Sequence, residues 1–253
     1  MPRLSLIVIT KNEEAAIERC IRSAAGIVDE IVVVDSGSTD RTVEIARGLG
    51  AKVIAPEGWP GYGPQKQRAL DAASGQWILS LDADEWIEGD LAREIENVLH
   101  DPAAANGYRM PRRNRFCGEI VRHGGWWPDH VLRLFRKDRA RFSDDPVHER
   151  VIAEGNIGTL KFPIEHNTIV SPQDAEGKTD RYARLAAQAL VENGRTSSRV
   201  AASIRGAAAF LRSFVLQRGF LDGKTGYRVA RYQASYTAKK WANVASARGT
   251  KIP

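Results

Sequence analysis

Apolar runs alternate with stretches of helical periodicity through the first hundred residues, and this alternation constrains the fold more than any other feature of the sequence. The run at residues 31–34 is Ile-Val-Val-Val, apolar at every position, as expected of a strand that is covered on both faces of its sheet. Strands that alternate with helices predict an α/β domain with an open, mostly parallel sheet and helices on both faces. The expected strands are residues 6–9, 30–34, 52–55 and 76–81, and the expected helices are 12–25, 42–49, 64–73 and 88–99.

The composition changes near residue 170. We expect residues 1–170 to form the α/β domain and residues 171–253 to form a helical, basic C-terminal region. From Arg195 onward, eight Arg and four Lys accompany a single acid, Asp222, a balance of 12 − 1 = +11. Because the net charge of the whole chain is +6, the remainder carries 6 − 11 = −5. Clustered positive charge predicts an anionic partner surface, either phosphorylated lipid or nucleic acid.

Helices are expected in the C-terminal region at 174–193, 198–216 and 224–246. The third mixes aromatic with basic residues, which suits the interface of an anionic membrane. The rival expectation is packing against protein, because amphipathic helices usually bury their apolar arc. In the second helix this arc consists of Val200, Ile204, Ala207, Ala208, Leu211, Phe214 and Val215. No stretch is long enough to span a bilayer, so we expect a cytoplasmic protein that is peripheral on the inner face of the cytoplasmic membrane.

Polar residues follow three of the expected strands at the point where each strand ends. They are Thr-Lys-Asn-Glu at 10–13, Asp-Ser-Gly-Ser at 35–38 and Asp-Ala-Asp at 82–84. Each could be an ordinary cap or turn, but ligands of open α/β sheets bind outside the carboxyl ends of the strands, which favours one shared site. Alternate residues of a strand point to the same side, so Asp82 and Asp84 can converge on a divalent cation that also holds a diphosphate. The sequence has neither a dinucleotide-binding glycine motif nor a phosphate-binding lysine loop, which disfavours dehydrogenases and phosphate-loop ATPases.

Three blocks in the first hundred residues resemble family-two glycosyltransferases with the GT-A fold. They are IVITKNEE at 7–14, IVVVDSGSTDRT at 31–42 and LDADE at 81–85, in the order and spacing of that family. The chain is most similar to the lipopolysaccharide core biosynthesis β-glucosyltransferase group, and the likeness continues through VHE at 147–149 and GFLDG at 219–223. The resemblance implies inverting sugar transfer from a nucleotide sugar, with Mg²⁺ or Mn²⁺ as cofactor.

The resemblance also implies roles for single residues. Asp35 matches the aspartate that accepts a hydrogen bond from the nucleotide base, usually uracil. Asp82 matches the carboxylate on the ribose or diphosphate side, and Asp84 matches the direct metal ligand, with Asp82 as the second metal candidate. His166 falls where some GT-A enzymes carry a late histidine ligand of the metal. The residues expected to contact the nucleotide sugar are Thr10, Lys11, Asn12, Glu13, Asp35, Gly37, Ser38, Lys66, Asp82 and Ala83.

The phosphate contact expected near residue 66 has an open alternative. Lys66 or Arg68 would meet the donor phosphates, while a solvated helix face is the competing interpretation. The asparagine that relatives commonly carry in this loop is absent from the sequence, which leaves the role of the loop open.

Inverting transfer needs a base that takes the proton of the acceptor hydroxyl. We place Glu149 ahead of Asp145 in this role, with His148 orienting the carboxylate or the diphosphate; an acidic surface loop is the alternative. Tryptophan rings stack well on sugars, so Trp126 and Trp127 are acceptor candidates, although either could be a hydrophobic plug beneath a loop.

The sequence therefore predicts a metal-dependent glycosyltransferase. We expect it to move a sugar, glucose from UDP-glucose, onto a lipopolysaccharide core or another lipid-linked glycan. A peptide or protein glycosyltransferase is the alternative. A non-catalytic nucleic-acid binder would explain the basic region but not the carboxylates, and the sequence has no nucleic-acid-binding module, so we expect no nucleic-acid partner.

Overall fold

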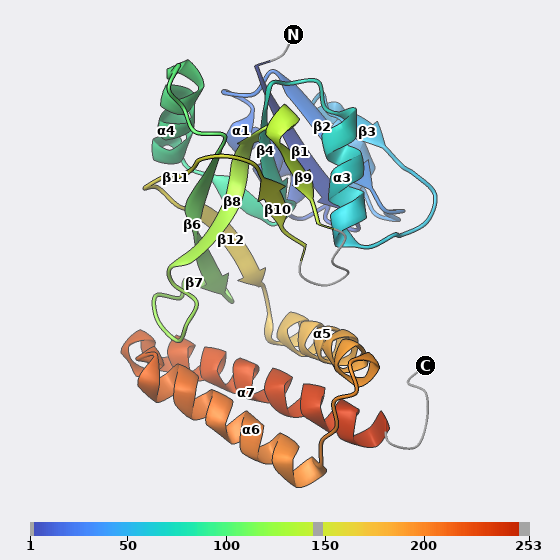
Figure 1. The fold of residues 1–253 in the computed structure, drawn as a ribbon, viewed down its shortest axis with the longest axis vertical. Helices are drawn as coiled ribbons and strands as arrows, with labels where there is room; N and C mark the ends of the chain where they lie inside the picture. The colour runs from blue at the N-terminus through green and yellow to red at the C-terminus, as the bar shows by residue number, and fades with distance from the viewer. Residues whose placement is uncertain (1–2, 144–148, 248–253) are drawn as a thin grey trace. The chain divides into compact units, whose positions relative to one another are not determined.

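The computed structural model describes residues 3–143 and 149–247 (Figure 1). Contacts within the chain separate it into two compact units. The first holds the residues up to Arg112 together with Asp129–His166, and the second holds Arg113–Pro128 together with the residues from Asn167 onward. The second unit is therefore built from the C-terminal helices and one segment from the middle of the chain.

The first unit is a mixed α/β structure around one large sheet, with strand order β3-β2-β1-β4-β8-β6-β12-β5. Four parallel strands at one end of this order are those predicted from the sequence, and antiparallel pairing begins where β4 meets β8. The strands are β1 (Leu4–Thr10), β2 (Glu30–Asp35), β3 (Lys52–Ile54), β4 (Trp77–Asp82), β5 (Glu85–Ile87), β6 (Gly107–Phe116), β8 (Asp129–Arg136) and β12 (Ile164–Ile169). Short β7 (Glu119–Ile120) and β11 (Ile157–Thr159) pair with β6, while β9 (Ala140–Phe142) and β10 (Val151–Ala153) form a separate ribbon.

The central strands are mostly apolar because each of their faces is covered. In β1, Leu6 and Val8 pack into one buried cluster with α1 (Ile17–Ala24) and α4 (Gly89–His100). Ile7 packs into a second cluster with α3 (Tyr62–Ala72). The remaining helix of the first unit, α2 (Thr42–Gly48), contributes the buried Ala46 to the first cluster.

The strand register brings the three polar strand ends to one edge of the sheet. Thr10 at the end of β1 pairs with Asp35 at the end of β2. On the other side of β1, Ile9 pairs with Asp82 at the end of β4. The prediction that these strand ends share one edge is therefore confirmed.

One local prediction was wrong. The first helix begins at Ile17 and not at residue 12, because Asn12 adopts a left-handed backbone (φ 56°) and its side chain binds the next loop instead of starting a helix. Beyond the predicted elements, the basic segment after Met110 forms part of strand β6, which extends to Phe116 and pairs with β8 and β7.

The second unit contains the predicted C-terminal helices, α5 (Pro172–Glu192), α6 (Arg199–Leu211) and α7 (Gly223–Ser246). Both α5 and α6 pack against α7. Between α6 and α7 the chain makes a π-helical turn (Arg212–Leu216) and a short 3-10 turn (Gly219–Asp222). Among the residues that the structure describes, no helix combines the length and the apolar character required to cross a bilayer.

Candidate active site

The loops after β1 and β2 are joined by hydrogen bonds into one polar surface. The Asn12 backbone N–H donates to Ser38 Oγ at 2.8 Å, and Asn12 Oδ1 accepts from the Thr39 N–H at 2.8 Å. The neighbouring Glu13 N–H donates to Thr42 Oγ1 at 2.7 Å. These bonds place Asn12, Glu13 and Ser38 together, while Lys11 is exposed beside them. Thr10 and Gly37 lie at the same edge through their contacts with Asp35.

Asp35 is buried at the base of this surface and organises the second loop. Its Oδ2 accepts the N–H groups of Gly37 and Ser38, both at 2.9 Å, and its Oδ1 accepts the Ser38 hydroxyl at 2.5 Å. Gly37 has φ 85°, a left-handed conformation that glycine adopts without strain. A carboxylate can accept about four hydrogen bonds, so Asp35 retains acceptor capacity beyond its own loop.

Thr10 carries one of two buried side-chain atoms that have no hydrogen-bond partner among the described residues. Its Oγ1 is one, and Arg133 Nε is the other. A buried polar atom without a partner costs about 1–3 kcal/mol, so an unsatisfied hydroxyl at the end of β1 is an indication of a bound ligand or water at this edge.

Asp82 lies at the centre of a charged network in which cations and carboxylates alternate. Its Oδ1 is 2.7 Å from Lys66 Nζ, and its Oδ2 accepts from Arg133 Nη2. Lys66 is buried, with only 4% of its side chain exposed, and its Nζ also lies 2.8 Å from Glu149 Oε1. The competing interpretation of Lys66 as part of a solvated helix face is therefore wrong.

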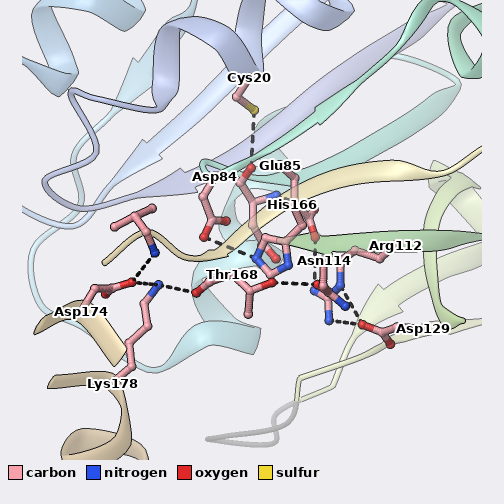
Figure 2. Close-up of polar contacts among 12 residues, drawn as sticks. Cys20, Asp84, Glu85, Arg112, Asn114, Asp129, His166, Thr168, Asp174 and Lys178 are labelled. Carbon is pink, nitrogen blue, oxygen red and sulfur yellow. Dashed lines mark hydrogen bonds and ion pairs between the residues drawn. The ribbon is translucent and has the colours of Figure 1, made fainter. Parts of the chain in front are cut away.

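Arg133 also connects the network to Glu85. The same Arg133 Nη2 donates to Glu85 Oε1 at 2.8 Å, and Glu85 Oε2 accepts the Asp82 backbone N–H at 3.0 Å. Arg112 lies 3.2 Å from the same Glu85 oxygen and 2.7 Å from Asp129 (Figure 2). Burial alone would raise the pKa of Asp82, but the Arg133 and Lys66 cations outweigh burial and hold this pKa well below its usual range.

Asp84 occupies a different environment from Asp82. Its Oδ2 lies 3.4 Å from His166 Nε2, and Figure 2 shows the two side chains facing each other. His166 is brought there by β12, which pairs antiparallel with β5 so that His166 is opposite Glu85. Ala83, between the two aspartates, is buried. Asp84 and His166 form a carboxylate–imidazole pair beside the Asp82 network.

Glu149 is held near Lys66 by a close approach of two backbone segments. A Cβ added to Gly63, in the first turn of α3, would lie 1.9 Å from the Ser143 carbonyl oxygen and 3.5 Å from Glu149 Cβ. Only glycine permits this approach, which brings the start of α3 against Ser143. The other two predicted members of this group, Asp145 and His148, lie outside the described residues.

The acceptor candidates Trp126 and Trp127 belong to the second unit. Trp126 is partly buried, with its ring centroid 6.0 Å from Phe116 and 6.1 Å from Tyr232. Trp127 is 38% exposed. Trp126 is thus packed under its loop, while Trp127 remains accessible to a ligand.

Sequence reasoning missed Arg133, Arg112 and Glu85 as members of the charged network. One signal was present: Arg133 interrupts the apolar strand Val-Leu-Arg-Leu-Phe at 131–135, and a buried arginine requires a carboxylate partner. The partner could not be named, because β8 joins β4 by an antiparallel pairing of strands far apart in the sequence.

Replacing Arg133 by methionine is expected to destabilise the fold by about 3–5 kcal/mol, because Asp82 and Glu85 would lose the cation between them. The native pKa of Asp82 is depressed, so its contribution to stability is present above about pH 4, the usual carboxyl pKa, and is lost as pH falls further. Urea unfolding of wild type and Arg133→Met at pH 7 measures the first effect. Arg139→Met, at a 53% exposed position, is the control that should unfold like wild type.

Comparison with known proteins adds evidence of a different kind. The sequence model of glycosyl transferase family 2 matches residues 5–157, which include Asp35, Asp82, Asp84 and Glu149. An uncharacterized glycosyltransferase of Rickettsia typhi is 32% identical over 238 residues, covering 90% of this chain and 81% of that protein. The lipopolysaccharide core biosynthesis glycosyltransferase LpsC of Rhizobium meliloti is 33% identical over 203 residues, covering 76% and 73%. A crystal structure of S. aureus TarS aligns with a TM-score of 0.48 at 18% identity, covering 96% of this chain and 90% of that one.

Proposed function

Because the chain belongs to glycosyl transferase family 2, and so is an enzyme that takes sugar from a nucleotide-sugar donor, we propose that it is a metal-dependent, inverting hexosyltransferase. The proposed donor is UDP-glucose, and the proposed acceptor is a lipopolysaccharide core or another lipid-linked glycan. The fold is the α/β, GT-A type expected from the sequence, followed by a helical and basic C-terminal region. The observation that carries the proposal is the pair Asp84 and His166 beside the charged network around Asp82, at the edge where the parallel strands end.

The donor set at Asp84 fits a divalent cation that is shared with a substrate. Carboxylate oxygen and imidazole nitrogen together suit Mn²⁺, and carboxylate alone suits Mg²⁺. Within residues 3–143 and 149–247 no three His, Cys, Asp or Glu side chains converge as a metal site. A cation held by Asp84 and His166 would need further oxygen ligands, which diphosphate and water supply in many enzymes. When bound, the ion would act as a Lewis acid for the charge that develops on the leaving diphosphate.

Asp82 serves the diphosphate or ribose side in this proposal, with Asp84 as the direct ligand. Both oxygens of Asp82 already face cations, Lys66 on one side and Arg133 on the other. These contacts support a role in which Asp82 fixes the position of Lys66, whose ammonium group is then available to an incoming phosphate oxygen. Asp82 remains the second candidate metal ligand.

Glu149 is the proposed base. In direct displacement, the acceptor oxygen forms a bond to the anomeric carbon, the bond from that carbon to the diphosphate breaks, and the acceptor proton passes to a Glu149 carboxylate oxygen. The support for this role is its place beside Lys66, with 20% of the Glu149 side chain exposed to an approaching acceptor. Asp145 is the alternative base, and His148 is the proposed orienting residue.

The acceptor proposal rests on the likeness to LpsC, and on Trp127 as an accessible ring that can stack on a sugar. A lipid-linked acceptor lies in a membrane. We therefore place the enzyme in the cytoplasm, on the inner face of the cytoplasmic membrane, with its basic C-terminal region against anionic lipid.

A screen of nucleotide sugars tests the reaction. UDP-glucose and other UDP-, GDP- and ADP-sugars are incubated with the protein with Mn²⁺, with Mg²⁺ or with a chelator, and release of free nucleotide is measured. We expect turnover of a UDP-sugar that requires the cation. Turnover that is equal in the chelator, or that is confined to a donor with a different base, would contradict the proposal.

Asp35→Asn is expected to raise the KM for the UDP-sugar by about 10- to 100-fold, because a hydrogen bond from the uracil to a carboxylate contributes about 1.5–3 kcal/mol. Asparagine keeps an oxygen for the loop N–H groups, so the melting temperature should change little. Steady-state kinetics with UDP- and ADP-glucose measures the effect. Asp101→Asn, on the surface after α4, is the control, and an unchanged KM for Asp35→Asn would remove Asp35 as the base-reading residue.

A further inference from the structure

Helix α6 packs against α7 with small residues and turns its large apolar side chains outward. Ala202 and Gly206 form its buried face, and Ser213 is buried in the π-helical turn that follows. A Cβ on Gly206 would lie 2.9 Å from Ala238 Cβ and 3.1 Å from the Ala234 carbonyl oxygen, so the two helices are in close contact at this point. Four members of the predicted apolar arc, Val200, Ile204, Leu211 and Val215, are exposed, and for these the expectation of packing against protein is wrong. Phe214, the largest member, packs against Tyr227 and Phe220. Small residues between helices and large ones outside are typical of helix pairs whose surroundings are lipid.

The outward side chains lie on α6 and in the turns between α6 and α7, and we call this set the apolar ridge. Eight of the twelve large hydrophobic residues that are exposed in the described chain fall within residues 200–227. The aromatic rings of Phe214 and Phe220, with centroids 6.4 Å apart, connect the end of α6 to the turn before α7. The apolar ridge consists of Ile204 (64% exposed), Leu211 (57%), Val215 (51%), Leu216 (78%), Phe220 (50%) and Leu221 (57%). Such a concentration of exposed apolar side chains marks an interaction site.

The charges around the apolar ridge are positive. Arg212, Arg218, Lys224 and Arg228 are exposed in or beside it. The one acid from residue 199 to residue 246, Asp222, is fully engaged: it accepts the backbone N–H groups of Arg122 and His123 and lies 2.7 Å from His123 Nδ1. An apolar surface with a cationic border complements the acyl chains and head groups of an anionic bilayer.

We propose that the hairpin of α6 and α7 inserts the apolar ridge into one leaflet of an anionic lipid bilayer, with the arginines and lysines around it at the head groups. This deepens the proposed membrane location by naming the surface that enters the lipid. It differs from attachment by charge alone, because the buried apolar side chains provide binding that salt does not screen.

The same hairpin holds the loop that carries Trp126 and Trp127. The Gly124 N–H donates to the Gln217 carbonyl oxygen at 2.9 Å, and the Gly124 carbonyl oxygen accepts from Gln233 Nε2 at 2.8 Å and from Ser213 Oγ at 3.2 Å. Insertion of the apolar ridge would thus fix the depth of this loop relative to the lipid. If the proposed function holds, the exposed Trp127 is presented to a glycan that projects from the same membrane.

Flotation of the full chain with vesicles tests the insertion. The vesicles are phosphatidylcholine alone or an equimolar mixture with phosphatidylglycerol, each at low and high salt. Wild type should bind the mixed vesicles and retain part of its binding at high salt. Leu216→Glu combined with Leu221→Glu should lower the partition coefficient by about 100-fold, since two exposed leucines lose their burial in lipid. Leu185→Glu, on an exposed position of α5 in the same unit, should bind like wild type.

A second measurement distinguishes insertion from adsorption. Tryptophan at position 220 (Phe220→Trp) should be quenched by lipids with brominated acyl chains, beyond the quenching of wild type. Wild-type binding by the double variant, loss of binding by Leu185→Glu, or no extra quenching would each overturn the inference. A wild-type dimer that the double variant converts to monomer would assign the apolar ridge to a second copy of the chain and also overturn it. Donor hydrolysis without vesicles tests the proposed function separately, because the double variant should hydrolyse donor at the wild-type rate.

Discussion

Asp84→Ala is expected to lower kcat/KM for sugar transfer by about a thousandfold or more. The substitution removes the carboxylate that faces His166, and with it the proposed hold on the cation that stabilises the leaving diphosphate. Nucleotide release from the UDP-sugar, measured over a range of Mn²⁺ concentrations, gives the rate. Calorimetric titration of Mn²⁺ in the presence of UDP gives the affinity, which should fall together with the rate.

The matched control for this experiment is Asp138→Asn, a carboxylate whose side chain is 72% exposed. It should behave like wild type in both measurements. If Asp84→Ala turned over donor at the wild-type rate, or bound Mn²⁺ with wild-type affinity, Asp84 would not be the metal ligand. A loss of activity accompanied by a lower melting temperature would call for His166→Ala as the second test, since that variant leaves the Asp82 network in place.

Glu149→Gln is expected to lower kcat for transfer by about a thousandfold while the KM for the donor changes little. The glutamine keeps the shape of the side chain and an oxygen that can face Lys66 Nζ, now 2.8 Å from Glu149 Oε1, but it cannot take a proton. Steady-state transfer to an isolated lipopolysaccharide-core acceptor gives kcat, and equilibrium titration with UDP gives donor binding.

Glu154→Gln serves as the control, because Glu154 is an exposed glutamate directly after strand β10. Normal donor binding with transfer at the wild-type rate would exclude Glu149 as the base and direct attention to Asp145. Loss of donor binding together with loss of transfer would instead make Glu149 part of the donor site, through its contact with Lys66.

The elements of the first hundred residues were predictable because their information is local. Mostly apolar strands alternate with helices of period 3.6 in a short stretch. Parallel strands impose a shared carboxyl edge, so the meeting of Thr10, Asp35 and Asp82 followed from the order of the elements alone. The position where the first helix begins did not follow, because the Asn12 side chain binds a loop 27 residues away.

The charged network could not be assembled from the sequence. Arg133 reaches Asp82, 51 residues away, because β8 pairs antiparallel with β4. Glu149 joins the network through Lys66, 83 residues away, and neither pairing was foreseen. The outward-facing ridge of α6 was also out of reach, since periodicity gives the arc of a helix but not the partner that it faces. The residue that marks the face of α6 turned toward α7 is Gly206, which lies against Ala238.

The contact between Gly63 and Ser143 has a consequence for other members of this family. In a relative that carries a larger residue at the equivalent of position 63, the start of α3 and the counterpart of Ser143 have to move apart. The identity of this residue thus offers a simple criterion for deciding to which homologous sequences the role proposed for Glu149 is transferred.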